Sequence, residues 1–211
     1  MPKHYPLDFS LLPTFEKSTA WMVLPRDMEI ALKALPLTYD RVLGCLDFAY
    51  RVWGNGGAHM PVTVKQREAS LRAALGEFVS MEQALKRDLQ GNSRRVIRIS
   101  DSPNPLLHVV RELRNLEMHL HSATLTSLTR DASFADQDIK LEIWVADDVT
   151  ETEFQRLANA KNYSDEDITR MLSWFNQAQK EWGIADLIYR CVCEYSKAIV
   201  SKYRLQAGSA R

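Results

Sequence analysis

Apolar residues recur at intervals of three and four along most of the chain, a pattern that predicts amphipathic helices. Long helices are expected over residues 38–53, 63–89, 105–129, 164–182 and 184–203, and shorter ones over residues 26–35 and 150–159. Gly54 and Gly91 follow two of these stretches and are expected to end the helices. Gly183 lies between the last two stretches, where it either ends one helix or bends a continuous one. The pattern predicts a mainly helical protein.

Two stretches have strand character instead. Residues 95–100 are rich in Val and Ile, and in residues 138–145 four apolar side chains alternate with polar ones, namely Ile139, Leu141, Ile143 and Val145. Trp144 interrupts the alternation and is the tryptophan expected to be exposed. Because an isolated strand leaves its backbone groups without partners, we expect these two stretches to pair. The predicted fold class is all-α, a helical bundle, with a small two-stranded β ribbon.

The length of 211 residues suits one large domain. Five prolines divide residues 1–36, which are expected to form an N-terminal arm on the body of the protein, with Phe9, Phe15, Trp21, Met22 and Leu24 as its packing residues. Residues 37–205 are expected to form a single helical domain, and residues 206–211 a flexible tail.

The composition is that of a globular protein outside the membrane. No run approaches the roughly 18 apolar residues of a membrane helix, and the polar, proline-containing start does not resemble a signal peptide. Three cysteines, Cys45, Cys191 and Cys193, are an odd number with no disulfide framework. We therefore expect a cytoplasmic protein.

Charge is unevenly distributed although the formal net charge is zero. Residues 86–114 contain seven basic and three acidic residues, a net charge of +4, whereas residues 131–167 contain three basic and eleven acidic residues, a net charge of −8. The basic zone permits a phosphate-bearing ligand nearby, and the alternative is that both segments are solvated faces.

Candidate chemistry lies in the predicted helix over residues 105–129, where residues 114–119 read Arg-Asn-Leu-Glu-Met-His. Arginine can grip a phosphate with two parallel hydrogen bonds, and histidine can move a proton near neutral pH. One stripe of this helix is expected to face the core, consisting of Leu106, Val109, Leu113, Leu116, Leu120 and Thr124.

The two flanks of that helix carry different polar residues. At 100° per residue, Asn115 and His119 share one flank with His108 and Glu112, while Arg114 and His121 lie on the other with Glu117 between them. Arg114 and His119 are separated by about 140° around the axis. A site on a single helix would use Arg114 with His121, or Asn115 with His119, whereas two copies of the helix in a symmetric dimer can bring Arg114 and His119 together.

Residues 114–119 resemble the signature of the HEPN (higher-eukaryote and prokaryote nucleotide-binding) ribonucleases, which is an arginine, four to six residues and a histidine, often with a polar residue after the arginine. Arg114 matches the arginine, Asn115 the polar residue, His119 the histidine at the shortest spacing and His121 at the longest. The resemblance covers at most residues 65–131. It implies a helical homodimer that cleaves RNA without a metal or other cofactor, often a toxin or defence effector restrained by an inhibitory protein partner.

The resemblance therefore leads us to expect a metal-independent endoribonuclease that acts on single-stranded RNA. Its catalytic candidates are Arg114, Asn115, His119 and His121, and its RNA-binding candidates are Arg94, Arg95, Arg98 and Arg111 of the basic zone. No metal site is expected, because His119 and His121 point about 200° apart on a helix. The alternative is a non-catalytic helical protein that binds a basic protein partner, with Arg114 and Glu117 as a surface ion pair.

Overall fold

The structure, a computed structural model, describes residues 4–14, 24–54, 62–90, 96–119, 124–134 and 137–205. These ranges contain seven α-helices, which are α1 (Arg26–Leu32), α2 (Pro36–Trp53), α3 (Val64–Asp88), α4 (Pro105–His119), α5 (Glu151–Gln155), α6 (Asp165–Trp182) and α7 (Ile184–Tyr203). They also contain the 3-10 helices η1 (Phe9–Leu11), η2 (Ile99–Asp101) and η3 (Ala160–Asn162), and the strands β1 (Leu125–Phe134) and β2 (Gln137–Ala146). The expected helical bundle with a small β ribbon is confirmed.

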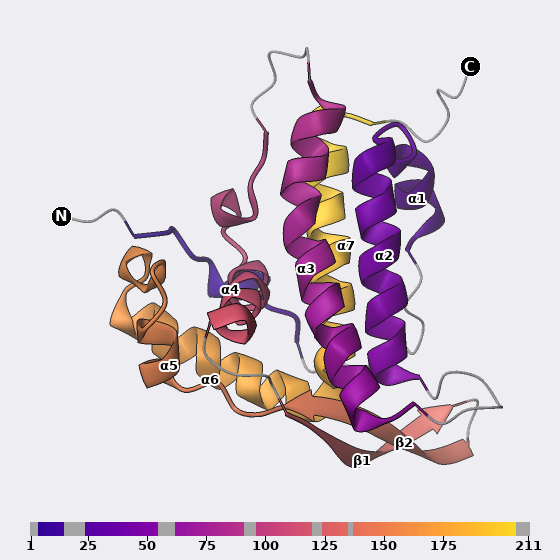
Figure 1. Ribbon diagram of the computed structural model, residues 1–211, viewed down its shortest axis with the longest axis vertical. Helices are drawn as coiled ribbons and strands as arrows, with labels where there is room; N and C mark the ends of the chain where they lie inside the picture. Colours follow the sequence, from indigo (N-terminus) through magenta and orange to yellow (C-terminus); the bar gives the residue numbers. More distant parts are fainter. Residues whose placement is uncertain are drawn as a thin grey trace.

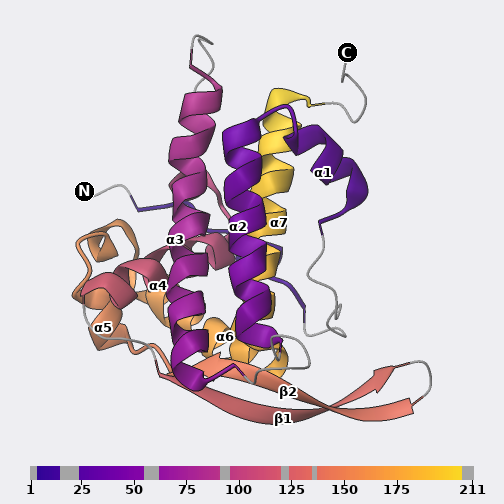
Figure 2. The same cartoon turned by 45° about the vertical axis from the view of Figure 1, so that its right-hand side comes forward.

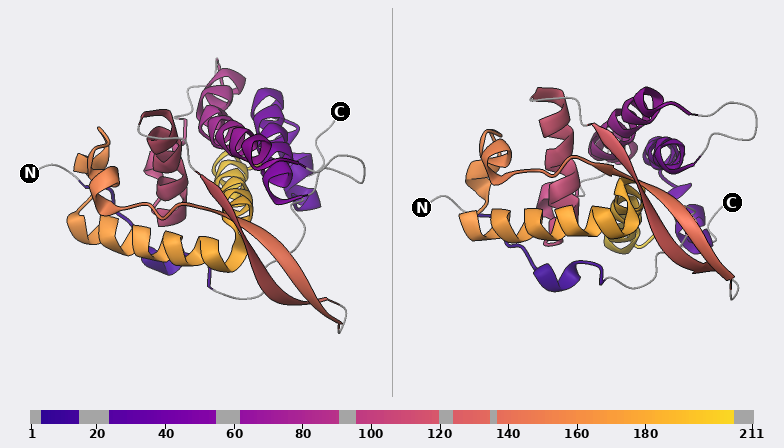
Figure 3. Two further views of the ribbon diagram at one scale, coloured as in Figure 1. Left: turned by 60° about the horizontal axis from the view of Figure 1, so that its bottom comes forward. Right: turned by 90° about the horizontal axis from the view of Figure 1, so that it is seen from below.

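Three long helices, α2, α3 and α7, stand side by side along the long axis of the molecule (Figures 1 and 2). The antiparallel β1–β2 hairpin lies across the lower end of these helices, and α6 leads to the same end (Figure 1). Seen from below, α4 crosses α6 rather than running along it (Figure 3). Buried apolar side chains from all seven helices and both strands form one continuous core.

Local sequence signals account for several helix boundaries. Thr63 and Gln66 form a reciprocal capping box at the start of α3, and the Ser164 hydroxyl accepts from the backbone N–H of Asp167 at the start of α6. Gly183 adopts a φ of +84° between α6 and α7, a backbone conformation that side chains disfavour. The expected helix after Ser164 and the expected last helix are both confirmed. Gly183 interrupts the helical conformation between them.

The predicted ribbon has a different first strand from the one expected. Residues 96–98 have no regular structure and residues 99–101 form η2, whereas β1 begins at Leu125, inside the stretch predicted to be helical to residue 129. Residues 124–129 contain three threonines and a serine, which are weak helix formers, and threonine favours strands. Pairing with β2, in which Leu128 lies opposite Ile143, supplies the backbone partners that make the strand the preferred state.

Trp144 is buried, with 9% exposure, which corrects the expectation that it is exposed. The guanidinium of Arg67 lies 4.5 Å from the centre of its ring. Nη1 of Arg67 also donates to the carbonyls of Val52 at 2.6 Å and Gly54 at 2.7 Å, at the end of α2. The buried cation therefore covers the tryptophan and satisfies carbonyls that an α-helix leaves without partners at its end.

The N-terminal arm crosses the body at α4 and α6. The backbone N–H of Tyr5 donates to the carbonyl of Asn162 at 2.8 Å, and the guanidinium of Arg170 lies 4.0 Å from the ring centre of Phe9. Leu24 is buried as expected, whereas Phe15, Trp21 and Met22 lie outside the described residues. Among the residues described, no helix combines the length and hydrophobicity needed to cross a membrane.

Candidate functional site

The helix that carries the candidate motif is buried around most of its circumference. Leu106, Leu107, Val109 and Val110 are each exposed by 2% or less, so apolar contacts are not restricted to the single stripe that was expected. The physical reason is that α4 contacts α3, α6 and α7 from different sides (Figure 1). Polar groups on its first three turns therefore need partners inside the protein.

Glu112 is the centre of a buried polar cluster. Its carboxylate has no solvent exposure and accepts from Nδ2 of Asn115 at 2.8 Å, from the Tyr163 hydroxyl at 3.2 Å and from Nδ2 of Asn159 at 3.3 Å. Nη1 of Arg111 lies 3.6 Å from its Oε1. These donors come from α4 and from the segment between α5 and α6, so the carboxylate joins two parts of the chain.

His108 extends the cluster by one helical turn. Its Nε2 lies 2.8 Å from the carbonyl oxygen of Ser102, which can only accept, so Nε2 carries a hydrogen. Burial, helped by the positive charge of Arg111, lowers the pKa of His108 below its ordinary value of 6.5, so the ring is neutral near pH 7. The other ring nitrogen, Nδ1, is then an acceptor.

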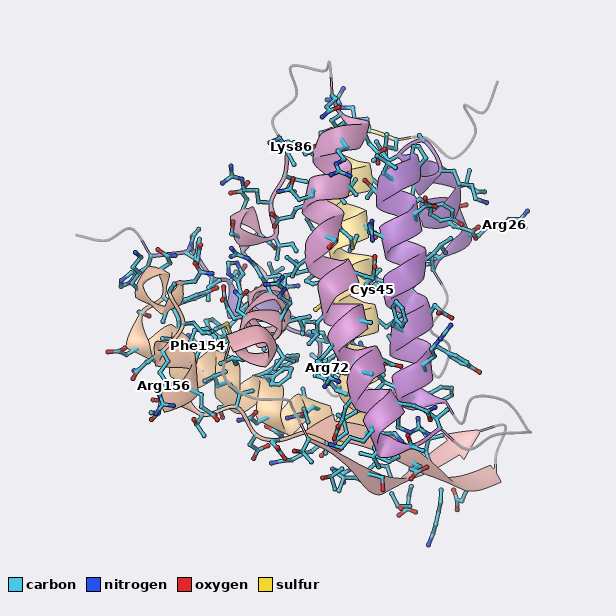
Figure 4. The ribbon with its side chains drawn as sticks, in the orientation of Figure 1. Arg26, Cys45, Arg72, Lys86, Phe154 and Arg156 are labelled. Carbon is cyan, nitrogen blue, oxygen red and sulfur yellow. The ribbon has the colours of Figure 1, made fainter. Side chains whose placement is uncertain are left out.

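Tyr163 connects this ring to Glu112. Its hydroxyl lies 3.1 Å from Nδ1 of His108 and 3.2 Å from Oε1 of Glu112, so one hydroxyl hydrogen faces two acceptors. Burial and the nearby Glu112 raise the pKa of Tyr163, which keeps the phenol protonated. The centre of the Tyr163 ring lies 5.4 Å from the centre of the Phe154 ring. Phe154 belongs to α5 and is labelled in Figure 4.

Arg111 points into this cluster. Its side chain is 21% exposed, and Nη1 makes no hydrogen bond within the described part of the chain, although it lies beside Glu112. Burial lowers the pKa of Arg111, but a hydrogen bond with Tyr5 and the negative charge of Glu112 outweigh this, so its pKa is raised overall. The assignment of Arg111 to RNA binding stays a prediction.

Arg114 and Asn115 lie one turn further along α4 and are both half-buried. Because Nδ2 of Asn115 donates to Glu112, its carbonyl oxygen is turned away from that carboxylate, and it accepts from Nη1 of Arg114 at 3.4 Å. The structure therefore brings these two motif residues together and fixes the orientation of the amide.

The remaining candidates are only partly described. His119 is the last residue of α4, one turn after Asn115, and its side chain lies outside the described set. His121, Arg94 and Arg95 lie outside the described residues altogether. Arg98 is exposed just before η2.

Sequence reasoning missed the buried role of Glu112 and its partners. A signal was present, because His108, Glu112 and Asn115 follow one another at intervals of four and three and so form one polar stripe on a helix. Tyr163 and Asn159, by contrast, are 51 and 47 residues away from Glu112. Nothing in the sequence pattern connects them to it.

Two surface hollows lined by described residues lie elsewhere. One of about 490 Å³ is lined by residues that include Tyr5, Ile97 and Lys202, and one of about 360 Å³ includes Tyr39, Leu43 and Tyr50. Arg114 lines neither of them. Among the described residues, no group of three or more His, Cys, Asp or Glu side chains is arranged to hold a metal ion.

No protein-family model matches this sequence. Comparison with curated proteins finds no match, and comparison with solved structures finds none either.

Proposed function

We propose that this chain is a metal-independent endoribonuclease that acts on single-stranded RNA, with Arg114, Asn115 and His119 as its principal groups. The supporting observation is the 2.8 Å bond from Asn115 to the fully buried Glu112, directly beside Arg114. Burying a carboxylate is unfavourable unless its donors are well placed. The half-buried guanidinium of Arg114 can bind a phosphate, and the carbonyl oxygen of Asn115 beside it can accept a hydrogen bond from a neighbouring group of the ligand.

In the proposed reaction, a histidine takes the proton of a ribose 2′-hydroxyl as its oxygen bonds to the adjacent phosphorus. The bond from phosphorus to the 5′ oxygen of the next nucleotide breaks, that oxygen takes a proton from water, and the histidine releases the proton it accepted to the solvent. Arg114 stabilises the extra negative charge that develops on phosphorus-bound oxygens. The products are a 2′,3′-cyclic phosphate and a 5′-hydroxyl, and no electrons are transferred to or from a cofactor.

We also propose that the active form is a homodimer. Arg114 and His119 are five residues apart on one helix and so diverge by about 140° around its axis. Two copies of the protein that meet at the half-buried motif residues of α4 would bring the arginine of one copy close to the histidine of the other. A monomer in light scattering at micromolar concentration contradicts this part of the proposal.

Further contacts in the proposal come from the basic zone. Arg98 is exposed, and Arg94 and Arg95 precede it in the sequence, so these cations are assigned to the RNA backbone. A cytoplasmic setting is part of the same proposal, since the three cysteines are free thiols.

The proposal is tested with an end-labelled single-stranded RNA incubated with the protein in the presence and absence of EDTA. We expect cleavage that survives chelation and products that end in 2′,3′-cyclic phosphate. Loss of cleavage on chelation, restored by Mg²⁺ or Mn²⁺, contradicts the metal-independent mechanism. Absence of cleavage across single-stranded RNAs of varied sequence overturns the ribonuclease proposal and favours a protein-binding role.

A further inference from the structure

The orientation of the Asn115 amide follows from its surroundings rather than from its own sequence. A carboxylate only accepts hydrogen bonds, so the group that Asn115 turns toward Glu112 is its NH2. Glu112 is fully buried and also accepts a hydrogen bond from the buried Tyr163 hydroxyl, so it holds a fixed position. Asn115 therefore presents its carbonyl oxygen, and not its NH2, to any ligand beside Arg114.

Arg114 and Asn115 are both half-buried and lie side by side. Nη1 of Arg114 lies 3.4 Å from Oδ1 of Asn115, so a cation and a hydrogen-bond acceptor are adjacent. The complementary ligand carries an anion next to a hydrogen-bond donor. In a nucleic acid, that combination is the phosphate next to a ribose 2′-hydroxyl, and deoxyribose lacks the donor.

We infer that Asn115, held by Glu112, is the residue that selects ribose over deoxyribose, by accepting a hydrogen bond from the 2′-hydroxyl next to the phosphate bound by Arg114. This inference rests on the proposed ribonuclease function. Glu112 acts as a positioning residue, since it touches the amide and not the RNA. A site built to pair with a hydroxyl discriminates against ligands without it, because its polar group is then left without a partner.

The orientation of the Asn115 amide depends on residue 112 being a carboxylate. A glutamine at position 112 has an amide that can donate as well as accept, so Asn115 can rotate and turn its NH2 outward. The acceptor beside Arg114 is then lost, while the charge of Arg114 and the packing of α4 remain. Discrimination between sugars can therefore be separated from phosphate binding.

The test measures binding rather than cleavage, with two fluorescent single strands of one sequence, one all-ribose and one uniformly 2′-fluoro. A 2′-fluoro group keeps an RNA-like sugar but cannot donate a hydrogen bond. The protein carries His119→Ala and His121→Ala so that the ribose strand stays intact. We expect it to bind the ribose strand about tenfold more tightly than the fluoro strand, the scale of one hydrogen bond.

Added to this background, Asn115→Ala is expected to bring the ratio of the two dissociation constants close to one, with little change for the fluoro strand. Glu112→Gln is expected to remove most of the preference. Asn159→Ala is the matched control, because it deletes another donor to Glu112 and leaves the Asn115 contact in place, so its ratio is expected to stay near that of the background. Circular dichroism establishes that each variant is folded.

The outcomes separate this inference from the proposed function. If the intact protein cleaves RNA but the background binds both strands equally, the inference fails and the ribonuclease proposal stands. The inference also fails, and the ribonuclease proposal stands, if Asn115→Ala in this background keeps the ratio of dissociation constants or if Asn159→Ala abolishes the preference. If neither strand is bound and RNA is not cleaved, both proposals fail together.

Discussion

The Tyr163 hydroxyl lies 3.2 Å from Oε1 of Glu112, although the two residues are 51 positions apart in the chain. Tyr163 precedes α6 and Glu112 belongs to α4, so this contact ties the segment between α5 and α6 to the motif helix. Its surroundings are closed to water, since Tyr163 is 4% exposed and Glu112 not at all. In such surroundings a polar group that loses its partner is costly.

Glu112→Ala is expected to lower the free energy of unfolding by about 3–5 kcal/mol, because it leaves the buried donors and the Arg111 cation without their acceptor. Glu112→Gln is expected to cost less, since its amide oxygen still accepts. Urea unfolding followed by circular dichroism measures both changes. Asp148→Ala is the control: Asp148 forms an exposed ion pair with Lys180, and its loss is expected to cost no more than about 1 kcal/mol. Equal losses for Glu112→Ala and the control contradict the buried-cluster description.

The buried ring of His108 is expected to make the protein less stable in mild acid. Its pKa in the folded state lies below the ordinary 6.5, so the unfolded chain binds the proton first as the pH falls. The stability that this neutral ring provides is therefore complete above pH 6.5 and is lost as the pH falls from there through the lower pKa of the folded state. The loss is at most about 1.4 kcal/mol per pH unit for this one group.

The comparison that isolates this effect is unfolding of the parent and of His108→Gln at a series of pH values between 7.5 and 5, where glutamine cannot take up the proton. We expect the parent to lose more stability than the variant over that range. If the free energies of unfolding of the two proteins change equally with pH, the pKa of His108 is not lowered in the folded state.

The contrast between α6 and α4 shows which features the sequence could predict. The start and end of α6 depend on Ser164 and Gly183, which act within a few residues of themselves, so they could be predicted. The strand β1 occupies the last residues of the stretch predicted to be helical, and it depends instead on partners across the hairpin, such as Ile143 opposite Leu128. Pairing with a residue 15 positions away therefore outweighs the helical spacing of apolar residues in the local sequence.

The candidate site likewise has features that the sequence could predict and features that it could not. Arg114, Asn115 and His119 could be picked out because their chemistry and spacing are local. The burial of Glu112 could not, since its donors Tyr163 and Asn159 reach it only through the packing of the segment before α6 on α4.

Gly183→Ala is expected to destabilise the protein by about 1–3 kcal/mol. The residue has a φ of +84°, and an added Cβ would lie 3.2 Å from Cβ of Ile143 and 3.3 Å from the carbonyl oxygen of Trp144. Gly76→Ala is the matched control within α3, where a Cβ meets nothing within 4 Å, and it is expected to stabilise the protein by about 0.5–1 kcal/mol. Thermal unfolding of both variants measures whether their melting temperatures shift in opposite directions relative to the parent.

The final prediction concerns which histidine acts in the proposed cleavage. Asn115 and His119 are four residues apart within α4 and so share one flank, whereas the position of His121 lies outside the described residues. We expect Arg114→Ala and His119→Ala each to reduce single-turnover cleavage of a labelled RNA by at least about 100-fold, the scale for losing a charge-stabilising or proton-transferring group. His121→Ala is expected to cost less. If His121→Ala is the inactive variant and His119→Ala stays active, the longer spacing of the motif is the functional one. If all three folded variants cleave like the parent, these side chains do not perform the reaction.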